Sequence, residues 1–255
     1  MVSFQGLKDF FFNEDPDNLE KIGSFYTIIS IVCGYVVFVT YVGPRLMRGR
    51  KPFKLNKILI TYNACIVLIN AFITYKIGTH TYPRLYMMCW SRDSYDIDYH
   101  IKYIFKYAWW FYLSKYADLL DTLFFVLRKK WRQISFLHVF HHGTIVFVCW
   151  LGIYLKHRGL YLAFGMPINA FIHVCTYSYY TLAAFGPRMQ KFLWWKKYLT
   201  FLQVGQFIVG LIFIFSTIAL GCEELEPIFI IVIPFGITLL LLFVNFYNKN
   251  YVKSD

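Results

Sequence analysis

The sequence lacks long polar stretches, and charged residues are scarce in it. Only 16% of its 255 residues are charged, whereas 58% are hydrophobic; a soluble domain is usually about 45–50% apolar. The segments between the hydrophobic runs are too short to form a second domain, and the chain has no internal repeat that we can detect. These absences exclude a soluble module and indicate a single membrane domain over residues 1–255.

The N-terminal segment also lacks the features of a secretory signal peptide. Residues 1–20 are acidic and amphipathic, without a basic start, an apolar stretch or a small-residue cleavage site. We therefore expect the first hydrophobic segment to remain in the mature protein.

The hydrophobic segments themselves predict the fold class. A helix that crosses a bilayer needs roughly 20 mostly apolar residues, and seven stretches meet this requirement. They lie at about 24–43, 57–77, 103–127, 134–153, 161–185, 198–219 and 228–247. We predict an all-α membrane protein with seven transmembrane helices.

The net charge of +12 is unevenly distributed over this topology. Sixteen Lys and Arg residues fall on one side, in 44–57, 128–133, 186–197 and the C-terminal tail, against six on the other side, which also holds eleven acidic residues. The positive-inside rule makes the basic side cytosolic, with the N-terminus outside the cytosol and the C-terminus in it. The basic side suits anionic lipid headgroups or an anionic substrate, and we expect no nucleic acid partner.

Cysteine is infrequent, and only Cys89 and Cys222 fall in loops. Both loops are on the non-cytosolic side, where disulfides form, so we predict a Cys89–Cys222 disulfide. The other four cysteines fall within spans, as small buried apolar residues do.

Ionisable residues inside a span are costly and indicate a functional site. In the third span, Lys115, Asp118 and Thr122 share one helical face with Asp121 at its edge, and Lys115 and Asp118 have the i,i+3 spacing of an ion pair. A purely structural ion pair is the alternative interpretation.

The fourth span contains three histidines within five residues. His138 and His142 share a face at i,i+4, and His141 lies about 60° around the helix from His138. Structural histidines that only form hydrogen bonds are the alternative.

Two further spans carry polar stripes, made of Asn169, His173, Tyr177 and Tyr180 in the fifth and of Thr200, Gln203 and Gln206 in the sixth. Interfacial anchoring is the alternative for the tyrosines, including Tyr179 on another face, and interhelical hydrogen bonding is the alternative for the amides. All four stripes fall in the cytosolic halves of their spans. We therefore predict one polar cavity, with the basic loops around its mouth.

Too few histidines are present for a di-iron oxygenase, and adjacent His141 and His142 diverge by about 100°, which disfavours a three-ligand metal site. We expect no metal and no other cofactor. Acid–base or covalent acyl chemistry remains. An apolar cavity with a cationic mouth suits an acyl-CoA, whose tail is apolar and whose head is polyanionic.

Four motifs in order carry a family resemblance: KYADLLDT at 115–122, HVFHH at 138–142, HVCTYSYY at 173–180 and TFLQVGQ at 200–206. Together they make the chain resemble the fatty acid elongases, which are membrane condensing enzymes with a histidine box. Asp118 stands where this family usually has Glu, and Thr176 where it often has Met. The first keeps the carboxylate, and the second replaces a packing residue with a polar one.

The resemblance implies that acyl-CoA and malonyl-CoA condense to 3-oxoacyl-CoA, two carbons longer, with release of CO2 and CoA. It implies an endoplasmic reticulum membrane protein whose polar helices enclose an acyl-CoA tunnel open to the cytosol. The N-terminus is then lumenal. Membrane lipids are expected partners, and a homodimer or other enzymes of the elongation cycle are compatible with it.

The resemblance also implies residue roles. His141 would be the nucleophile that forms an acyl-imidazole or, in a one-step alternative, a base or charge stabiliser. His138 and His142 would orient it or accept protons, and His173 would stabilise an enolate or oxyanion. Asp118 and Asp121 complete the catalytic set. The substrate-binding set is Lys115, Thr122, Arg128, Asn169, Tyr177, Tyr179, Tyr180, Lys196, Thr200, Gln203 and Gln206, with Arg128 and Lys196 near the CoA phosphates.

A seven-span lipid receptor or transporter without catalytic activity is the competing interpretation. It accounts for the topology and a polar cavity, but it gives no reason for three histidines in five residues beside a helix with carboxylates.

Overall fold

The computed structural model describes residues 23–85, 95–154, 160–221 and 228–252. Within these ranges the chain is helical without any strand, and each of the seven hydrophobic stretches lies on helix, as predicted. The longer helices are α2 (Phe25–Val37), α4 (Asn56–Thr81), α6 (Tyr95–Leu127), α7 (Phe136–Tyr154), α8 (Leu160–Ala184), α9 (Lys196–Ala219) and α10 (Phe229–Tyr247). Cys89 and Cys222 lie outside the described residues, so their disulfide stays a prediction.

Short helical segments extend or connect the long helices. The π-helix η2 (Phe38–Val42) and α3 (Gly43–Leu46) continue α2, and η6 (Asn248–Val252) continues α10. The 3-10 segments are η3 (Tyr82–Arg84), η4 (Trp131–Gln133) and η5 (Pro187–Phe192).

Among the described residues, five helical segments are long and apolar enough to cross a membrane. They are Phe25–Leu46, Asn56–Arg84, Phe136–Tyr154, Lys196–Ala219 and Phe229–Val252. The two long helices outside this set, α6 and α8, carry the lysine, carboxylates, asparagine and histidine of the polar site described below. These helices are candidate membrane spans by length and composition, while the count of seven crossings and the enclosed tunnel stay predictions.

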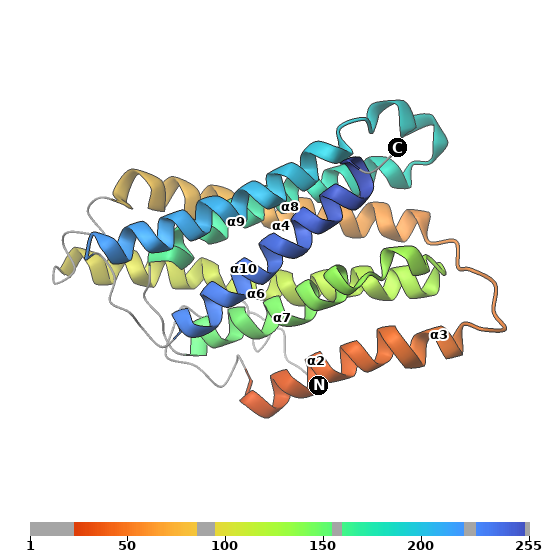
Figure 1. Ribbon diagram of the computed structural model, residues 1–255, viewed down its shortest axis with the longest axis horizontal. Helices are drawn as coiled ribbons and strands as arrows, with labels where there is room; N and C mark the ends of the chain where they lie inside the picture. Colours follow the sequence, from red (N-terminus) through yellow and green to blue (C-terminus); the bar gives the residue numbers. More distant parts are fainter. Residues whose placement is uncertain (1–22, 86–94, 155–159, 222–227, 253–255) are drawn as a thin grey trace, which may run out of the picture.

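The helices run back and forth along the long axis of the bundle, with α2 and α3 at one edge (Figure 1). Ser24 is the N-cap of α2, and its hydroxyl accepts a hydrogen bond from the Thr27 amide at 3.3 Å. At the other end of this segment, Gly43 permits a close approach to α6. A Cβ atom there would lie 2.8 Å from Cγ1 of Val126, closer than two carbon atoms can pack.

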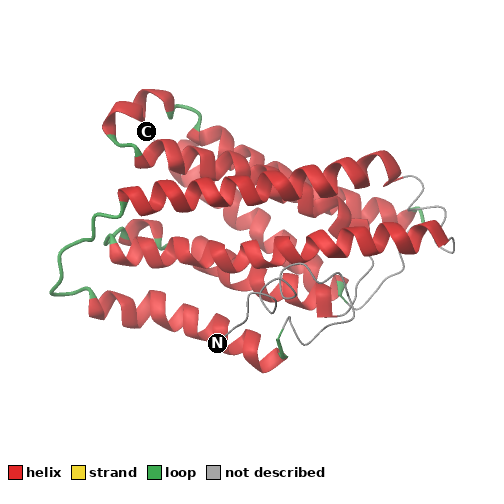
Figure 2. Ribbon diagram, turned by 180° about the vertical axis from the view of Figure 1, so that it is seen from behind, coloured by secondary structure: helices red, strands yellow, loops and turns green. Residues whose placement is uncertain are grey.

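The basic loops gather at one end of the bundle (Figure 2). The loop after α3 meets the end of α6, where the Phe53 amide donates to the Leu127 carbonyl at 3.1 Å and Lys129 Nζ donates to the Arg48 carbonyl at 3.4 Å. The loops that the sequence places on one side of the membrane therefore lie together in space.

An apolar core joins α4, α6 and α8, with Ile73, Ile77, Phe111, Met166 and Ala170 among its buried residues. Phe111 lies one helical turn before Lys115 on α6. The polar site consequently begins where this core ends, toward the basic end of the bundle.

Candidate functional site

The polar face predicted on α6 is buried as a unit. Lys115 and Asp118 are each 1% exposed, and Asp121 and Thr122 are also buried. Charged groups without partners would cost several kcal/mol in such surroundings, so each must find a counter-charge or a hydrogen bond. Each of these four side chains has at least one such partner.

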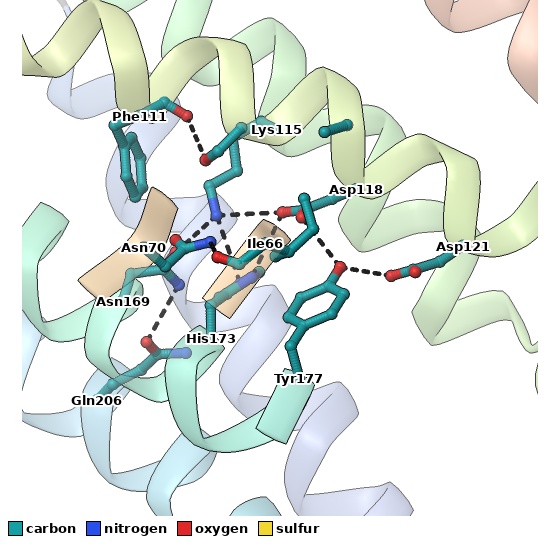
Figure 3. A network of polar contacts seen from close by, with 12 residues as sticks. Ile66, Asn70, Phe111, Lys115, Asp118, Asp121, Asn169, His173, Tyr177 and Gln206 are labelled. Carbon is teal, nitrogen blue, oxygen red and sulfur yellow. Dashed lines mark hydrogen bonds and ion pairs between the residues drawn. The ribbon is translucent and has the colours of Figure 1, made fainter. Parts of the chain in front are cut away.

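Lys115 Nζ has polar neighbours on two helices (Figure 3). It donates to Asp118 Oδ2 at 3.3 Å and to Asn169 Oδ1 at 3.0 Å, and it lies 3.4 Å from His173 Nε2. Its charge also lies 4.5 Å from the centre of the Phe111 ring. An ammonium group has three protons, so these three partners saturate it. The ion pair predicted from the i,i+3 spacing is confirmed.

His173 lies between the two charges of this pair. If Nε2 accepts a proton from Lys115, the ring proton is on Nδ1, and Nδ1 lies 3.4 Å from Asp118 Oδ2. This contact lacks hydrogen-bond alignment, so Nδ1 remains buried without a hydrogen-bond partner. His173 is thus oriented by Lys115 at one nitrogen and is available at the other.

Tyr177 joins the two carboxylates of α6. Its hydroxyl lies 2.9 Å from Asp118 Oδ1 and also forms a hydrogen bond with Asp121 Oδ2 (Figure 3). A tyrosine hydroxyl has one proton, so it can donate to only one of these groups. The other contact requires a proton on the carboxyl group. Because Asp118 faces Lys115, the additional proton belongs on Asp121, which then donates to the Tyr177 oxygen.

The polar stripe of α8 extends the network to α9. Asn169 Nδ2 donates to Gln206 Oε1 at 3.2 Å while Asn169 Oδ1 accepts from Lys115. Asn169, His173 and Tyr177 therefore share one face, as predicted. Tyr180 lies at the margin of this stripe, 39% exposed, with its ring edge-on to that of Tyr177.

The histidines of α7 form a second group. His138 Nε2 lies 2.9 Å from Thr122 Oγ1, and the His138 ring lies 4.2 Å from that of His142. The His141 ring contacts those of His142 and Phe243. Nδ1 of His141 and Nδ1 of His142 are buried without a hydrogen-bond partner. His141 is near enough to His173 and Lys115 for electrostatic interaction, so the two groups border one region.

Other predicted site residues remain apart from this network. Arg128, Tyr179, Lys196, Thr200 and Gln203 make no direct hydrogen bond to it within the described part of the chain. Tyr179 packs edge-on against Trp195, and Thr200 is buried on α9. Of the amides on α9, only Gln206 reaches the network. Arg128 follows the last residue of α6 and Lys196 begins α9, so both lie near the basic loops.

Some polar residues near the site escaped the sequence analysis. Tyr35 on α2 forms a hydrogen bond with Thr122, and Tyr62 on α4 donates to the Ala117 carbonyl at 2.9 Å. Asn63 and Asn70 are buried on α4, where Asn70 donates to the Ile66 carbonyl at 3.0 Å. The asparagines share one face at i,i+7 and could have been found by the argument applied to the other spans. A single tyrosine in an apolar helix gives no such signal.

Thr176, one of the two departures from the resembled family, has its hydroxyl buried without a hydrogen-bond partner. In the described ranges, no group of three or more His, Cys, Asp or Glu side chains is arranged to hold a metal ion.

Comparison with known proteins agrees with the motifs. The model of the ELO family, described as GNS1/SUR4, matches residues 21–255. Very long chain fatty acid elongase 4 of Mus musculus is 41% identical over 223 residues, covering 88% of this chain and 71% of the relative. Very long chain fatty acid elongase 7 of Rattus norvegicus is 40% identical over 233 residues (89% and 81%), and elongase 7 of Drosophila melanogaster is 35% identical over 256 (99% and 78%). The chain belongs to the ELO, or GNS1/SUR4, family.

Proposed function

We propose that this protein condenses a long-chain acyl-CoA with malonyl-CoA to give a 3-oxoacyl-CoA two carbons longer, with release of CO2 and CoA. It is then a very-long-chain 3-oxoacyl-CoA synthase, an acyltransferase for the first step of fatty acid elongation. Membership of the ELO family supports this function, because the relatives compared above are named very long chain fatty acid elongases.

One structural observation, independent of family membership, also supports the proposed activity. Three imidazole nitrogens, Nδ1 of His141, His142 and His173, are buried without hydrogen-bond partners. A buried polar atom without a partner costs about 1–3 kcal/mol, and native proteins keep few of them. Substrate groups that bind between α7 and α8 would supply the missing partners.

In the proposed reaction, an imidazole nitrogen of His141 attacks the thioester carbonyl carbon and expels CoA as its thiolate. Malonyl-CoA then loses CO2, and the resulting enolate attacks the acyl-imidazole, which releases the 3-oxoacyl-CoA and restores the histidine. The thiolate takes up one proton, so the net reaction consumes one proton. The proton inferred on Asp121 is a source within the network.

Charge stabilisation would come mainly through His173. Its Nε2 faces Lys115, whose three protons already have partners in the protein. Lys115 would therefore act through His173 rather than by binding substrate, and His173 Nδ1 would donate to the developing oxyanion. In the one-step alternative, His141 serves as base or charge stabiliser in the same position.

The location of the basic loops supports the proposed orientation. We place the site toward the cytosol in an endoplasmic reticulum membrane crossed seven times, with a lumenal N-terminus and a cytosolic C-terminus. The acyl tail would occupy a tunnel between the helices. Arg128 and Lys196, near the basic loops, would then lie close to the CoA phosphates.

The decisive experiment incubates the purified protein with acyl-CoA alone. The acyl-imidazole route predicts stoichiometric release of free CoA and an acyl adduct on the peptide containing His141. His141→Ala should lose both, whereas Cys175→Ala, which removes the nearest rival nucleophile on α8, should keep both. Release of CoA only after malonyl-CoA is added would favour the one-step route. Labelled malonyl-CoA that gives no elongated product with a folded protein would refute the condensing activity and favour a receptor or transporter.

A further inference from the structure

Helix α2 reaches the histidine cluster through a single hydroxyl group. Tyr35 Oη lies 2.7 Å from Thr122 Oγ1, and Thr122 Oγ1 lies 2.9 Å from His138 Nε2. Thr122 is fully buried, so no water competes for these contacts. Three helices, α2, α6 and α7, each contribute one residue to this chain of hydrogen bonds.

The direction of the protons follows from counting donors. The Thr122 hydroxyl has one proton, so it donates to one neighbour and accepts from the other. If Tyr35 donates to Thr122, then Thr122 donates to His138 Nε2, and both hydroxyl protons have an acceptor. In the opposite direction the Tyr35 proton has no acceptor among the described residues. The first arrangement avoids that cost and leaves the proton of the neutral His138 ring on Nδ1.

We infer that Tyr35 is a positioning residue for the catalytic histidines, which holds His138 in the Nδ1–H tautomer through Thr122. This inference rests on the condensing function proposed above. The tautomer gives His138 an orienting role, because Nε2 already accepts a hydrogen bond from the Thr122 hydroxyl. Nε2 cannot take up a proton without breaking that hydrogen bond.

The packing around Tyr35 supports this role. Tyr35 and Val32 lie against Gly143 of α7, next to His142; a Cβ atom at Gly143 would be 3.8 Å from the Tyr35 ring. His138 in turn lies against the His142 ring. The edge helix α2 (Figure 1) thus orients His138, whose ring contacts His142, and the ring of His142 contacts that of His141.

The test begins with Tyr35→Phe, which removes only the hydroxyl. We expect kcat to fall about tenfold and KM to change less than about twofold, because the hydroxyl acts through His138 on the orientation of the histidines and does not touch substrate. Tyr41→Phe, an exposed tyrosine of the adjoining π-helix, is the matched control and should leave kcat unchanged.

A second series separates orientation from general damage to packing. Thr122→Val should lower kcat at least as much as Tyr35→Phe, and Thr122→Ser should recover most of that loss. Combining Tyr35→Phe with Thr122→Val should cost no more than Thr122→Val alone, since both remove the same relay. Additive losses in the double variant, or full activity of Tyr35→Phe, would overturn the inference.

A direct measurement does not depend on catalysis. The 15N chemical shifts of His138 in the membrane-reconstituted wild type should report the Nδ1–H tautomer, and Tyr35→Phe should shift the population toward Nε2–H. An Nε2–H tautomer in the wild type would overturn the relay even if condensation is demonstrated. The expected tautomer in a protein that lacks condensing activity would instead refute the proposed function alone.

Discussion

The two polar groups of this bundle differ in how completely their atoms are paired. Around Lys115, each proton of the ammonium group faces an acceptor, and Asn169 connects this centre to α9. Among the histidines of α7, His138 has a partner in Thr122, but His141 and His142 each retain a buried nitrogen without one. The Lys115 ammonium group is thus saturated within the protein, whereas His141 and His142, like Nδ1 of His173, leave atoms available to a ligand.

The difference follows from charge. A lysine and a carboxylate inside an apolar bundle must be matched to one another, because an unpaired ion there is far more costly than an unpaired neutral imidazole. The Lys115 network therefore contributes to the stability of the fold, and the histidine cluster can keep nitrogens without protein partners. Substitutions of the charged pair should accordingly lower stability, whereas substitution of His141 should abolish activity without lowering stability.

The largest effect on stability should come from Asp118→Asn. It leaves Lys115 without its nearest counter-charge in a buried position, which costs about 3–5 kcal/mol. We expect the variant to unfold at lower denaturant concentration in detergent and to accumulate poorly in membranes. An unfolding midpoint equal to that of the wild type would show that Lys115 and Asp118 do not stabilise each other as a charged pair.

Two controls sharpen that result. Asp121→Asn should cost less than about 1 kcal/mol, because the proton count makes Asp121 a neutral acid that an amide can replace as a donor to Tyr177. The double variant Lys115→Met with Asp118→Leu should recover much of the lost stability, since both charges are removed together. Equal losses for Asp118→Asn and Asp121→Asn would contradict the inferred protonation.

An intermediate effect is expected for Asn169→Leu. It removes an acceptor from Lys115 and a donor from Gln206, and loss of hydrogen bonds to a charged group costs about 1–3 kcal/mol. Thr181→Val on the same helix is the matched control, because the Thr181 hydroxyl donates only to the Tyr177 carbonyl of its own helix. Thermal unfolding in detergent should separate the two variants. Equal unfolding midpoints for the two variants would show that the hydrogen bonds of Asn169 do not stabilise the fold.

The sequence predicted helices better than it predicted their lengths. The span expected at 57–77 corresponds to α4, Asn56–Thr81, but the span expected at 103–127 begins much earlier in the structure, because α6 runs from Tyr95. Hydropathy reports the apolar part of a helix, and the polar residues Asp96, Asp98 and Lys102 continue α6 without apolar character. Helical boundaries outside an apolar region therefore escape such a prediction.

Within the site, periodicity predicted which residues share a helix face but not which helices meet. The spacing correctly predicted the Lys115–Asp118 pair within α6 and the shared face of Asn169, His173 and Tyr177 on α8, but not the contacts of Lys115 and Asp118 with α8. It could not distinguish Gln206, which reaches Asn169, from Gln203, which does not, because the rotation of α9 depends on tertiary packing. Tyr35 was missed because a single tyrosine in an apolar helix gives no periodic signal.

The smallest loss of stability should follow substitution of His141, even though its loss of activity should be complete. Leu in place of His141 removes a buried nitrogen that has no partner, so the free energy of unfolding should stay unchanged or rise. The same substitution at His138 removes the acceptor of Thr122 and should cost about 1–3 kcal/mol. Both side chains come from the same short stretch of α7, so differences in helix propensity cancel. Denaturant titration of the two variants, alongside condensation assays, tests the distinction directly. If His141→Leu destabilises the protein as much as His138→Leu does, then His141 has a structural partner, and the division between a paired network and an available cluster fails.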